Sequence, residues 1–209
     1  MGAELAKESH IDSDLIVPVP DSGVPAAIGY SEEIKKNIEL GIIRNHYVGR
    51  TFIEPTQQIR SFGVKLKHNI NKSLIKDKSL VLIDDSLVRG TTSIKIIKML
   101  YDAGAKEVHL RIASPPIKYP DYYGVDTPNQ NELLASKFNV EGMRKFINAT
   151  TLQFLSIEGL YTSMGYEKRN SSYPQFTDHC FTGEYPVRPI DVNDNNFVDE
   201  QLTLMSSKS

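Results

Sequence analysis

Two adjacent carboxylates, Asp84 and Asp85, precede a short loop that is rich in hydroxyl groups. The loop runs through Ser86, Leu87, Val88, Arg89, Gly90, Thr91, Thr92 and Ser93. Its hydroxyls can donate to the oxygens of a phosphate monoester, and its glycine lets the backbone turn and come close to them. Carboxylates would repel a phosphate, so we assign the acidic pair to sugar hydroxyls or to a Mg²⁺ ion on the same ligand. The sequence therefore predicts a site for a phosphorylated sugar.

A second loop of the same design occurs earlier in the chain. Asp21, Ser22 and Gly23 follow an apolar run, and Pro25 lies near the first turn of the next expected helix. Gly23 allows successive backbone amides to face one anion, which makes a concave site suited to pyrophosphate. Taken alone, the same residues fit a capped helix with Asp21 or Ser22 as the N-cap. The presence of two similar loops favours the anion site.

The segment 44–67 is rich in cations and is interrupted by glycines. Such a segment between two phosphate loops can close over a pyrophosphate and exclude water during a reaction. Lys65 and Lys67 fit a solvated charged face more readily, so we expect Arg44 and Arg50 to make the contacts.

A scaffold has to position these residues. Along the chain, short apolar segments typical of strands alternate with segments whose apolar residues recur at helical spacing. Strands are expected at 15–19, 80–83 and 108–113, and helices around 24–28 and 94–100. Gly104 is the expected stop of the second helix. The alternation predicts a mostly parallel sheet with helices. Ligands of such sheets bind at the carboxyl ends of the strands, where both loops fall and where the N-terminus of a helix favours anions.

Composition narrows the class of protein. The 209 residues carry a formal charge of −2, which provides no basic field for nucleic acid. No apolar run approaches the roughly 20 residues of a membrane helix, and the first residues do not resemble a signal peptide. The single cysteine excludes an internal disulfide. We therefore expect a cytoplasmic protein with neither nucleic-acid nor membrane partners.

Four segments resemble the type I phosphoribosyltransferase family, and within it the amidotransferases that act on phosphoribosyl pyrophosphate. These segments are residues 19–23, 44–53, 81–93 and 132–135. The resemblance implies an α/β fold in which a mostly parallel open sheet is flanked by helices, with a flexible lid and an irregular C-terminal tail. It places the phosphoribosyltransferase domain at residues 1–165, shortened at its N-terminus, and leaves 166–209 as an extension whose end is expected to be disordered.

The resemblance also assigns roles to residues. Both loops and the acidic pair take the substrate-binding role, with Mg²⁺ held by the ligand together with Asp84 and Asp85. In the lid, the catalytic residues are Arg44, Tyr47 and Arg50, and the substrate-binding residue is Thr51. Arg44 stands where family members usually carry lysine, so a planar guanidinium replaces a point charge there.

The implied reaction is phosphoribosyl transfer from phosphoribosyl pyrophosphate to ammonia, which gives 5-phosphoribosylamine and pyrophosphate in the first step of purine synthesis. The family's glutaminase domain is absent from this sequence, so ammonia or a separate glutaminase subunit is the expected nitrogen source. A homo-oligomer with purine nucleotides as feedback ligands is also expected. Two alternatives stay open: an inactive remnant or regulator that binds phosphoribosyl pyrophosphate or nucleotides, and a nucleobase salvage transferase.

The residues 179–186 resemble the region that provides iron–sulfur ligands in some members of the family. A cluster normally takes four cysteine thiolates, and this chain has only Cys180. We therefore expect no iron–sulfur cluster and treat Cys180 as a packing residue. Three tyrosines, Tyr119, Tyr122 and Tyr123, either wall one side of the site or pack in the core, and core packing is the favoured expectation.

Overall fold

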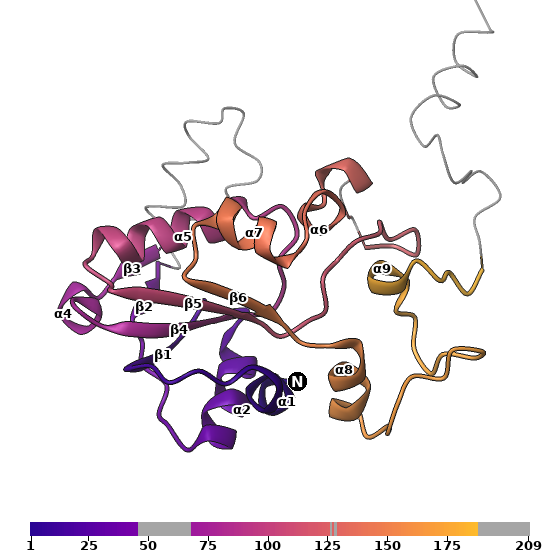
Figure 1. Ribbon diagram of the computed structural model, residues 1–209, viewed down its shortest axis with the longest axis horizontal. Helices are drawn as coiled ribbons and strands as arrows, with labels where there is room; N and C mark the ends of the chain where they lie inside the picture. Colours follow the sequence, from indigo (N-terminus) through magenta and orange to yellow (C-terminus); the bar gives the residue numbers. More distant parts are fainter. Residues whose placement is uncertain (46–67, 126, 128, 188–209) are drawn as a thin grey trace, which may run out of the picture.

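The computed structural model describes residues 1–45, 68–125, 127 and 129–187. Its centre is a four-stranded sheet in the order β1-β4-β5-β6, with every pair parallel (Figure 1). The strands are β1 Leu15–Pro18, β4 Ser79–Asp84, β5 Glu107–Ile112 and β6 Thr151–Phe154. Nearly all residues of β1, β4 and β5 are buried, as in parallel sheets that are covered on both faces. The predicted mostly parallel sheet is confirmed.

Helices cover both faces of this sheet. One face carries α1 Gly2–Ser9, α2 Val24–Ile34 and α8 Ile157–Ser163, and the other carries α5 Thr91–Asp102 and α7 Val140–Ile147 (Figure 1). Successive strand residues feed two separate apolar clusters because side chains alternate across a sheet. Val81 and Ile83 pack with α1 and α2, whereas Leu80 and Leu82 pack with α5.

Short elements complete the described part of the chain. Strands β2 Ile42–Arg44 and β3 His68–Ile70 pair antiparallel in a second sheet. The short helices are α4 Lys72–Ile75, the 3-10 helix η2 Gln130–Glu132, α6 Leu134–Lys137 and α9 His179–Thr182. None of the helices in the described ranges has the length and apolar character needed to cross a membrane.

Glycines set the ends of the two helices that follow the candidate loops. Gly90 adopts φ +77° as the N-cap of α5, a conformation that L side chains rarely adopt. The helix ends at Asp102, and Gly104 follows with φ +95°, close to the predicted stop. The N-cap of α2 is Gly23, with no side-chain cap. The alternative in which Asp21 or Ser22 caps this helix is therefore wrong.

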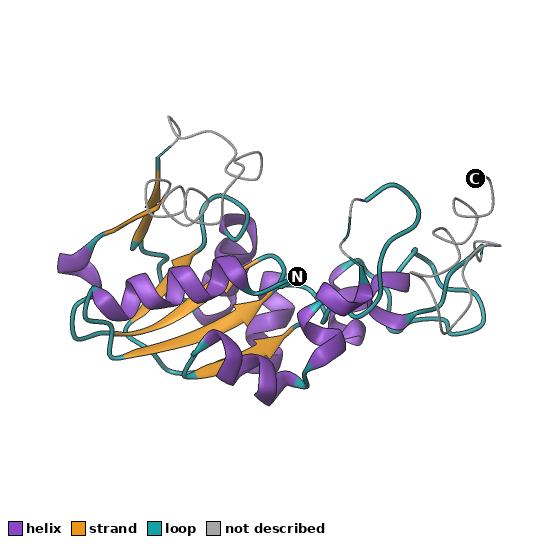
Figure 2. Cartoon of the chain, turned by 90° about the horizontal axis from the view of Figure 1, so that it is seen from above, coloured by secondary structure: helices purple, strands orange, loops and turns teal. Residues whose placement is uncertain are grey.

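The C-terminal segment 166–187 lies beyond the end of the sheet at which the strands terminate, beside the segment that follows β5 (Figures 1 and 2). The ring of Tyr122 lies 5.2 Å from that of Tyr185, and the ring of Tyr123 lies 4.9 Å from that of His179. Tyr119 donates its backbone N–H to the carbonyl of Cys180, at 3.1 Å. These tyrosines belong to neither core cluster, so the prediction that they pack in the core is wrong. They hold the C-terminal segment instead.

Candidate functional site

The two predicted anion loops meet at the carboxyl ends of neighbouring strands. Pro18 of β1 lies opposite Ile83 of β4, and the Val19 N–H donates to the carbonyl of Ile83 at 2.8 Å. The hydroxyl of Ser22 then donates to Oδ1 of Asp84 at 3.1 Å, across 62 residues of sequence. The two loops are therefore parts of one site, at the edge of the sheet where open α/β folds bind ligands.

The first loop is shaped by how closely it approaches β4. Its turn closes through a 2.8 Å bond from the Gly23 N–H to the carbonyl of Val19, and the Pro20–Asp21 peptide is cis. A Cβ atom at Gly23 would lie 2.2 Å from the carbonyl oxygen of Ile83. Only glycine fits there, because the crowding atom belongs to the backbone of a buried strand.

We expect Gly23→Ala to lower by about 100-fold the kcat/KM for phosphoribosyl pyrophosphate, the substrate that the family resemblance implies, because a shift of about 1 Å in a binding loop has effects of that size. We also expect it to lower the free energy of unfolding by about 2 kcal/mol through overpacking. Steady-state kinetics and urea unfolding measure the two effects. Gly29→Ala within α2 is the control, since its added Cβ would lie 3.2 Å from the backbone N of Ala3, a tight contact but a far milder one than the 2.2 Å contact at Gly23. Equal effects of the two substitutions would contradict this reading of the loop.

Arg44 reaches the first loop from β2. Its guanidinium forms an ion pair with the carboxylate of Asp21. The pair is partly exposed, so its contribution to stability is small. Its consequence is positional: a cation lies beside the loop that the sequence assigns to pyrophosphate.

Asp84 and Asp85 differ sharply in environment. Asp84 is 8% exposed, whereas Asp85 is exposed. Oδ1 of Asp84 accepts the Asp85 N–H at 2.9 Å, and the hydroxyl of Ser86 donates to Asp85 at 3.0 Å. Burial, and secondarily the charge of Asp85, raises the pKa of Asp84 to about 7. A buried acid of this kind attracts a hydroxyl donor or a cation, which is what the sugar and its Mg²⁺ ion would supply.

The raised pKa of Asp84 predicts how stability depends on pH. Between its ordinary value of 3.8 and about 7, the folded chain keeps a proton that the unfolded chain has released. The stability that this group contributes is therefore fully present below the ordinary pKa and is lost as pH rises towards 7, by a total of about 4 kcal/mol. Asp84→Asn should remove this slope, so that the variant is the more stable protein at pH 8. Urea unfolding from pH 5 to 8 without divalent metal tests this; parallel profiles of the two proteins would contradict it.

The second loop leads directly into α5. Leu87 and Ser93 are buried and fix the loop, while Thr91 and Thr92 are exposed at the first turn of the helix. The first helical bond runs from the Ile94 N–H to the carbonyl of Gly90 at 2.9 Å. The amides before Ile94 precede any intrahelical partner, so they present donors and partial positive charge to the loop. This arrangement suits a phosphate group.

The structure thus places Asp21, Ser22, Gly23, Arg44 and the loop from Asp84 to Ser93 around one edge of the sheet. The lid predictions for Tyr47, Arg50 and Thr51 lie outside the described residues. Sequence reasoning missed a contact: Glu132 pairs with Arg89 at 2.9 Å. The signal available was the segment 132–135, which carried part of the family resemblance without an assigned role.

The residues considered as metal ligands, the acidic pair and Cys180, differ in how well they suit a metal. Asp84 and Asp85 offer the oxygen ligands that Mg²⁺ prefers, and Mg²⁺ commonly shares such ligands with substrate phosphates. Within the described ranges, no group of three or more His, Cys, Asp or Glu side chains is arranged to hold a metal ion by itself. Cys180 is a free thiol in the C-terminal segment, and burial raises its pKa. One half-buried thiol does not fit an iron–sulfur cluster, which normally takes four.

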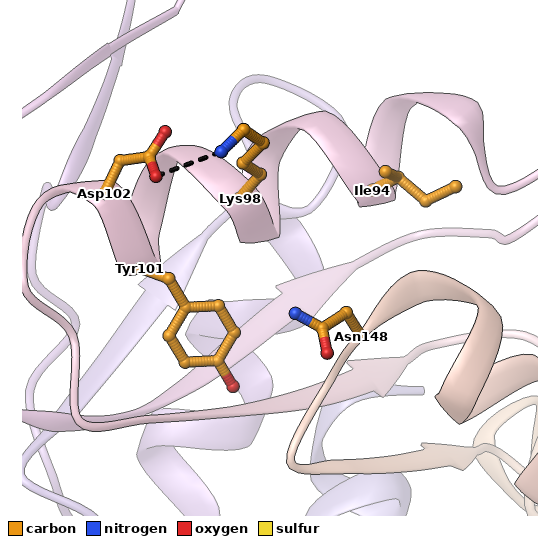
Figure 3. Close-up of a pocket in the computed structure, with 5 residues that line it drawn as sticks. All are labelled: Ile94, Lys98, Tyr101, Asp102 and Asn148. Carbon is orange, nitrogen blue, oxygen red and sulfur yellow. Dashed lines mark hydrogen bonds and ion pairs between the residues drawn. The ribbon is translucent and has the colours of Figure 1, made fainter.

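Two surface pockets lie away from these loops. One, of about 350 Å³, lies between α5 and the end of α7 and is lined by Ile94, Lys98, Tyr101, Asp102 and Asn148 (Figure 3). The other, of about 430 Å³, is lined by Lys118, Tyr119, Gln130, Ala135, Ser136, Lys137, Phe138 and Asn139. Neither contains the acidic pair, so the candidate site rests on the contacts between the loops and not on cavity size.

Comparisons with known proteins agree with this geometry. Residues 2–115 match the family model of the phosphoribosyl transferase domain. The chain is 58% identical to the amidophosphoribosyltransferase of Rhizobium etli over 208 residues, which are 99% of this chain and 42% of that protein. It is 48% identical to the amidophosphoribosyltransferase of Bacillus subtilis over 187 residues, 90% of this chain and 39% of that protein. The chain therefore spans about two fifths of the length of these relatives.

Two solved structures are similar to this chain in both fold and sequence. Glutamine phosphoribosylpyrophosphate amidotransferase from B. subtilis, complexed with ADP and GMP, superposes with a TM-score of 0.79 at 48% identity. The match covers 90% of this chain and 41% of that one. A structure described as the allosteric regulatory enzyme of purine biosynthesis matches with a TM-score of 0.78, also at 48% identity.

Proposed function

The chain belongs to the phosphoribosyltransferase family, and on that premise we propose that it transfers the phosphoribosyl group of phosphoribosyl pyrophosphate to ammonia. The products are 5-phosphoribosylamine and pyrophosphate, in the first step of purine synthesis. The observation that carries the proposal is the contact of Ser22 with Asp84, which joins two anion loops into one site. The choice of ammonia as acceptor is supported by the amidophosphoribosyltransferases among the relatives.

The charges that develop in this reaction are opposite in sign to the charged and polar groups of the site that would face them. Breaking the bond between the anomeric carbon and pyrophosphate leaves positive charge on the ribose ring and added negative charge on the departing oxygens. Fixed groups aimed at such charge give the largest rate gains. We place the pyrophosphate at Asp21, Ser22 and Gly23, and the 5-phosphate at the loop from Ser86 to Ser93. The ribose hydroxyls then face Asp84 and Asp85. Mg²⁺ bound with the substrate would neutralise part of the pyrophosphate charge.

Arg44 is proposed to act on the leaving group. Its fork of donors can contact two oxygens at once, which a lysine cannot do with fixed geometry. The ion pair with Asp21 holds it beside the pyrophosphate loop. Tyr47, Arg50 and Thr51 are proposed as further contacts, on the family resemblance alone.

The proposal also covers the nitrogen source, the feedback ligands and the domain bounds of the protein. The nitrogen source is proposed to be ammonia, taken up free or delivered by a glutaminase unit. Purine nucleotides are proposed as feedback ligands, supported by the relative solved with ADP and GMP. We retain residues 1–165 as the catalytic domain and 166–209 as an extension, in a cytoplasmic homo-oligomer.

The test is a pyrophosphate-release assay. The purified chain is supplied with Mg²⁺, phosphoribosyl pyrophosphate and ammonium at alkaline pH, where free ammonia is present; parallel reactions omit ammonium or replace it by glutamine. We expect release that depends on ammonium and none from glutamine. Turnover no higher than that of an Asp84→Asn, Asp85→Asn double variant would overturn the proposal. Calorimetric titration with phosphoribosyl pyrophosphate would then distinguish a binding protein from an inactive remnant.

A further inference from the structure

We propose that residues 132–134, here called the brace, fix the conformation of the loop from Ser86 to Ser93, here called the phosphate loop. Within the brace, Glu132 is a positioning residue that acts through Arg89. This inference rests on the proposed function, because it assigns the braced loop to the 5-phosphate of the substrate. It adds a determinant of substrate affinity that lies outside both anion loops.

Three consecutive residues of the phosphate loop contact this segment. The carbonyl of Val88 accepts the Leu134 N–H at 2.8 Å. Arg89 donates from Nε to a carboxylate oxygen of Glu132 at 2.9 Å. A Cβ atom placed on Gly90 would lie 3.0 Å from Cδ2 of Leu134, so this side chain packs closely against the glycine. The segment thus contacts the loop through backbone, charge and apolar surface together.

The brace is itself anchored in the fold. Leu133 is 0% exposed and Leu134 is 3% exposed, and Leu134 belongs to the core cluster on the α5 side of the sheet. The hydroxyl of Ser136 donates to the carbonyl of Leu133 at 2.8 Å. A loop with few buried contacts opens easily, and attachment to a buried segment reduces that freedom. The conformation of residues 88–90 is therefore set partly by residues more than 40 positions away in the sequence.

Glu132 controls a side chain that can reach an anion. Arg89 lies in the phosphate loop with its side chain 51% exposed, and the bond to Glu132 uses only Nε. The N–H donors of its terminal amino groups are not engaged by Glu132 and can serve a phosphate. Holding Arg89 in one orientation before the substrate arrives reduces the entropy lost on binding. Because the 5-phosphate takes no part in the bond that breaks in the proposed reaction, this contact should affect KM more than kcat.

The test is Glu132→Gln, assayed for kinetics and for binding of the two ends of the substrate. We expect KM for phosphoribosyl pyrophosphate to rise about threefold to tenfold, with kcat within about twofold of wild type. The Kd of ribose 5-phosphate should rise by the same factor, and the Kd of pyrophosphate with Mg²⁺ should stay unchanged. A purely structural role would not separate the two ends in this way.

Glu141→Gln is the matched control, because Glu141 also pairs with an arginine at the surface, Arg144, at 2.7 Å. A second arm tests the route through Arg89: once Arg89→Met is present, adding Glu132→Gln should have no further effect on KM. Equal kinetics of Glu132→Gln and Glu141→Gln would overturn the inference, as would additive effects in the double variant. If the wild-type chain neither turns over nor binds ribose 5-phosphate, the proposed function itself has failed.

Discussion

The Asp84→Asn, Asp85→Asn double variant is expected to lose about 1,000-fold or more in kcat/KM for phosphoribosyl pyrophosphate, by analogy with the removal of preorganised electrostatic groups from other active sites. Both substitutions keep the size of the side chain and remove its charge. Oδ1 of Asp84 accepts hydrogen bonds from the Ser22 hydroxyl and the Asp85 N–H, and the amide oxygen of asparagine can accept the same bonds. The loops should therefore keep their contact while the site loses the charges that face the ribose and its cation.

Measurement of pyrophosphate release decides this prediction. Asp102→Asn is the control, because Asp102 is an exposed carboxylate on α5 that forms an ion pair with the surface residue Lys98 at 3.2 Å. The double variant should unfold at pH 8 no more easily than the wild type, since it has lost a buried carboxylate. A loss of activity below about tenfold would show that the acidic pair does not face the reacting sugar, because even one preorganised group is worth more than that.

Local sequence was sufficient to predict both loops and the elements around them. Gly90 and Gly104 flank α5, and the apolar run that ends at Asp84 marks the carboxyl end of β4. Such features could be predicted because they depend on backbone freedom and on side-chain periodicity within a few residues.

Contacts between distant segments could not be predicted in this way. The bond from Ser22 to Asp84 depends on the pairing of β1 with β4, which no local pattern specifies. The raised pKa of Asp84 depends on burial, and burial is a property of the assembled fold. The pair of Arg89 with Glu132 likewise needs η2 to fold back over the phosphate loop.

The C-terminal segment shows the same limit most clearly. Its composition, rich in Ser, Asn, Pro and Tyr, is typical of an irregular extension, and bends and irregular backbone do dominate residues 166–187 apart from the short helix α9. The structure nevertheless places charged groups there with little access to water: Asp178 is 3% exposed, and the side chain of Arg169 is 11% exposed. Buried charges have to be paired, so this ion pair links the two halves of the segment to each other.

Arg169→Met is expected to lower the free energy of unfolding by about 3 kcal/mol, the range found when one partner of a buried ion pair is removed. Arg169 donates to Asp178 at 2.5 Å and to Glu184 at 2.6 Å, and Asp178 also accepts the hydroxyl of Tyr161 at 2.9 Å. Without the guanidinium, Asp178 stays buried with neutral donors only. Methionine keeps most of the apolar stem, so the loss reports the charge and not the packing.

The pH dependence of that loss identifies its origin. Burial by itself would raise the pKa of Asp178, but the hydrogen bonds from Arg169 and Tyr161 hold it below its ordinary value. A lowered pKa in the fold gives stability that is present above the ordinary value near 4 and is lost as pH falls through the lowered one. The deficit of Arg169→Met should therefore be largest at neutral pH and shrink on acidification, as measured by urea unfolding at pH 7 and pH 3.5.

Two further variants separate the buried pair from a general effect of removing a cation. Lys98→Met removes an exposed partner of Asp102, and we expect a change within about 0.5 kcal/mol. Adding Asp178→Asn to Arg169→Met removes the stranded carboxylate and should restore part of the loss. If Arg169→Met is no less stable than Lys98→Met, the C-terminal segment contributes little to the fold. If the deficit appears with ammonium-dependent turnover per folded molecule unchanged, the segment stabilises the domain without taking part in its chemistry.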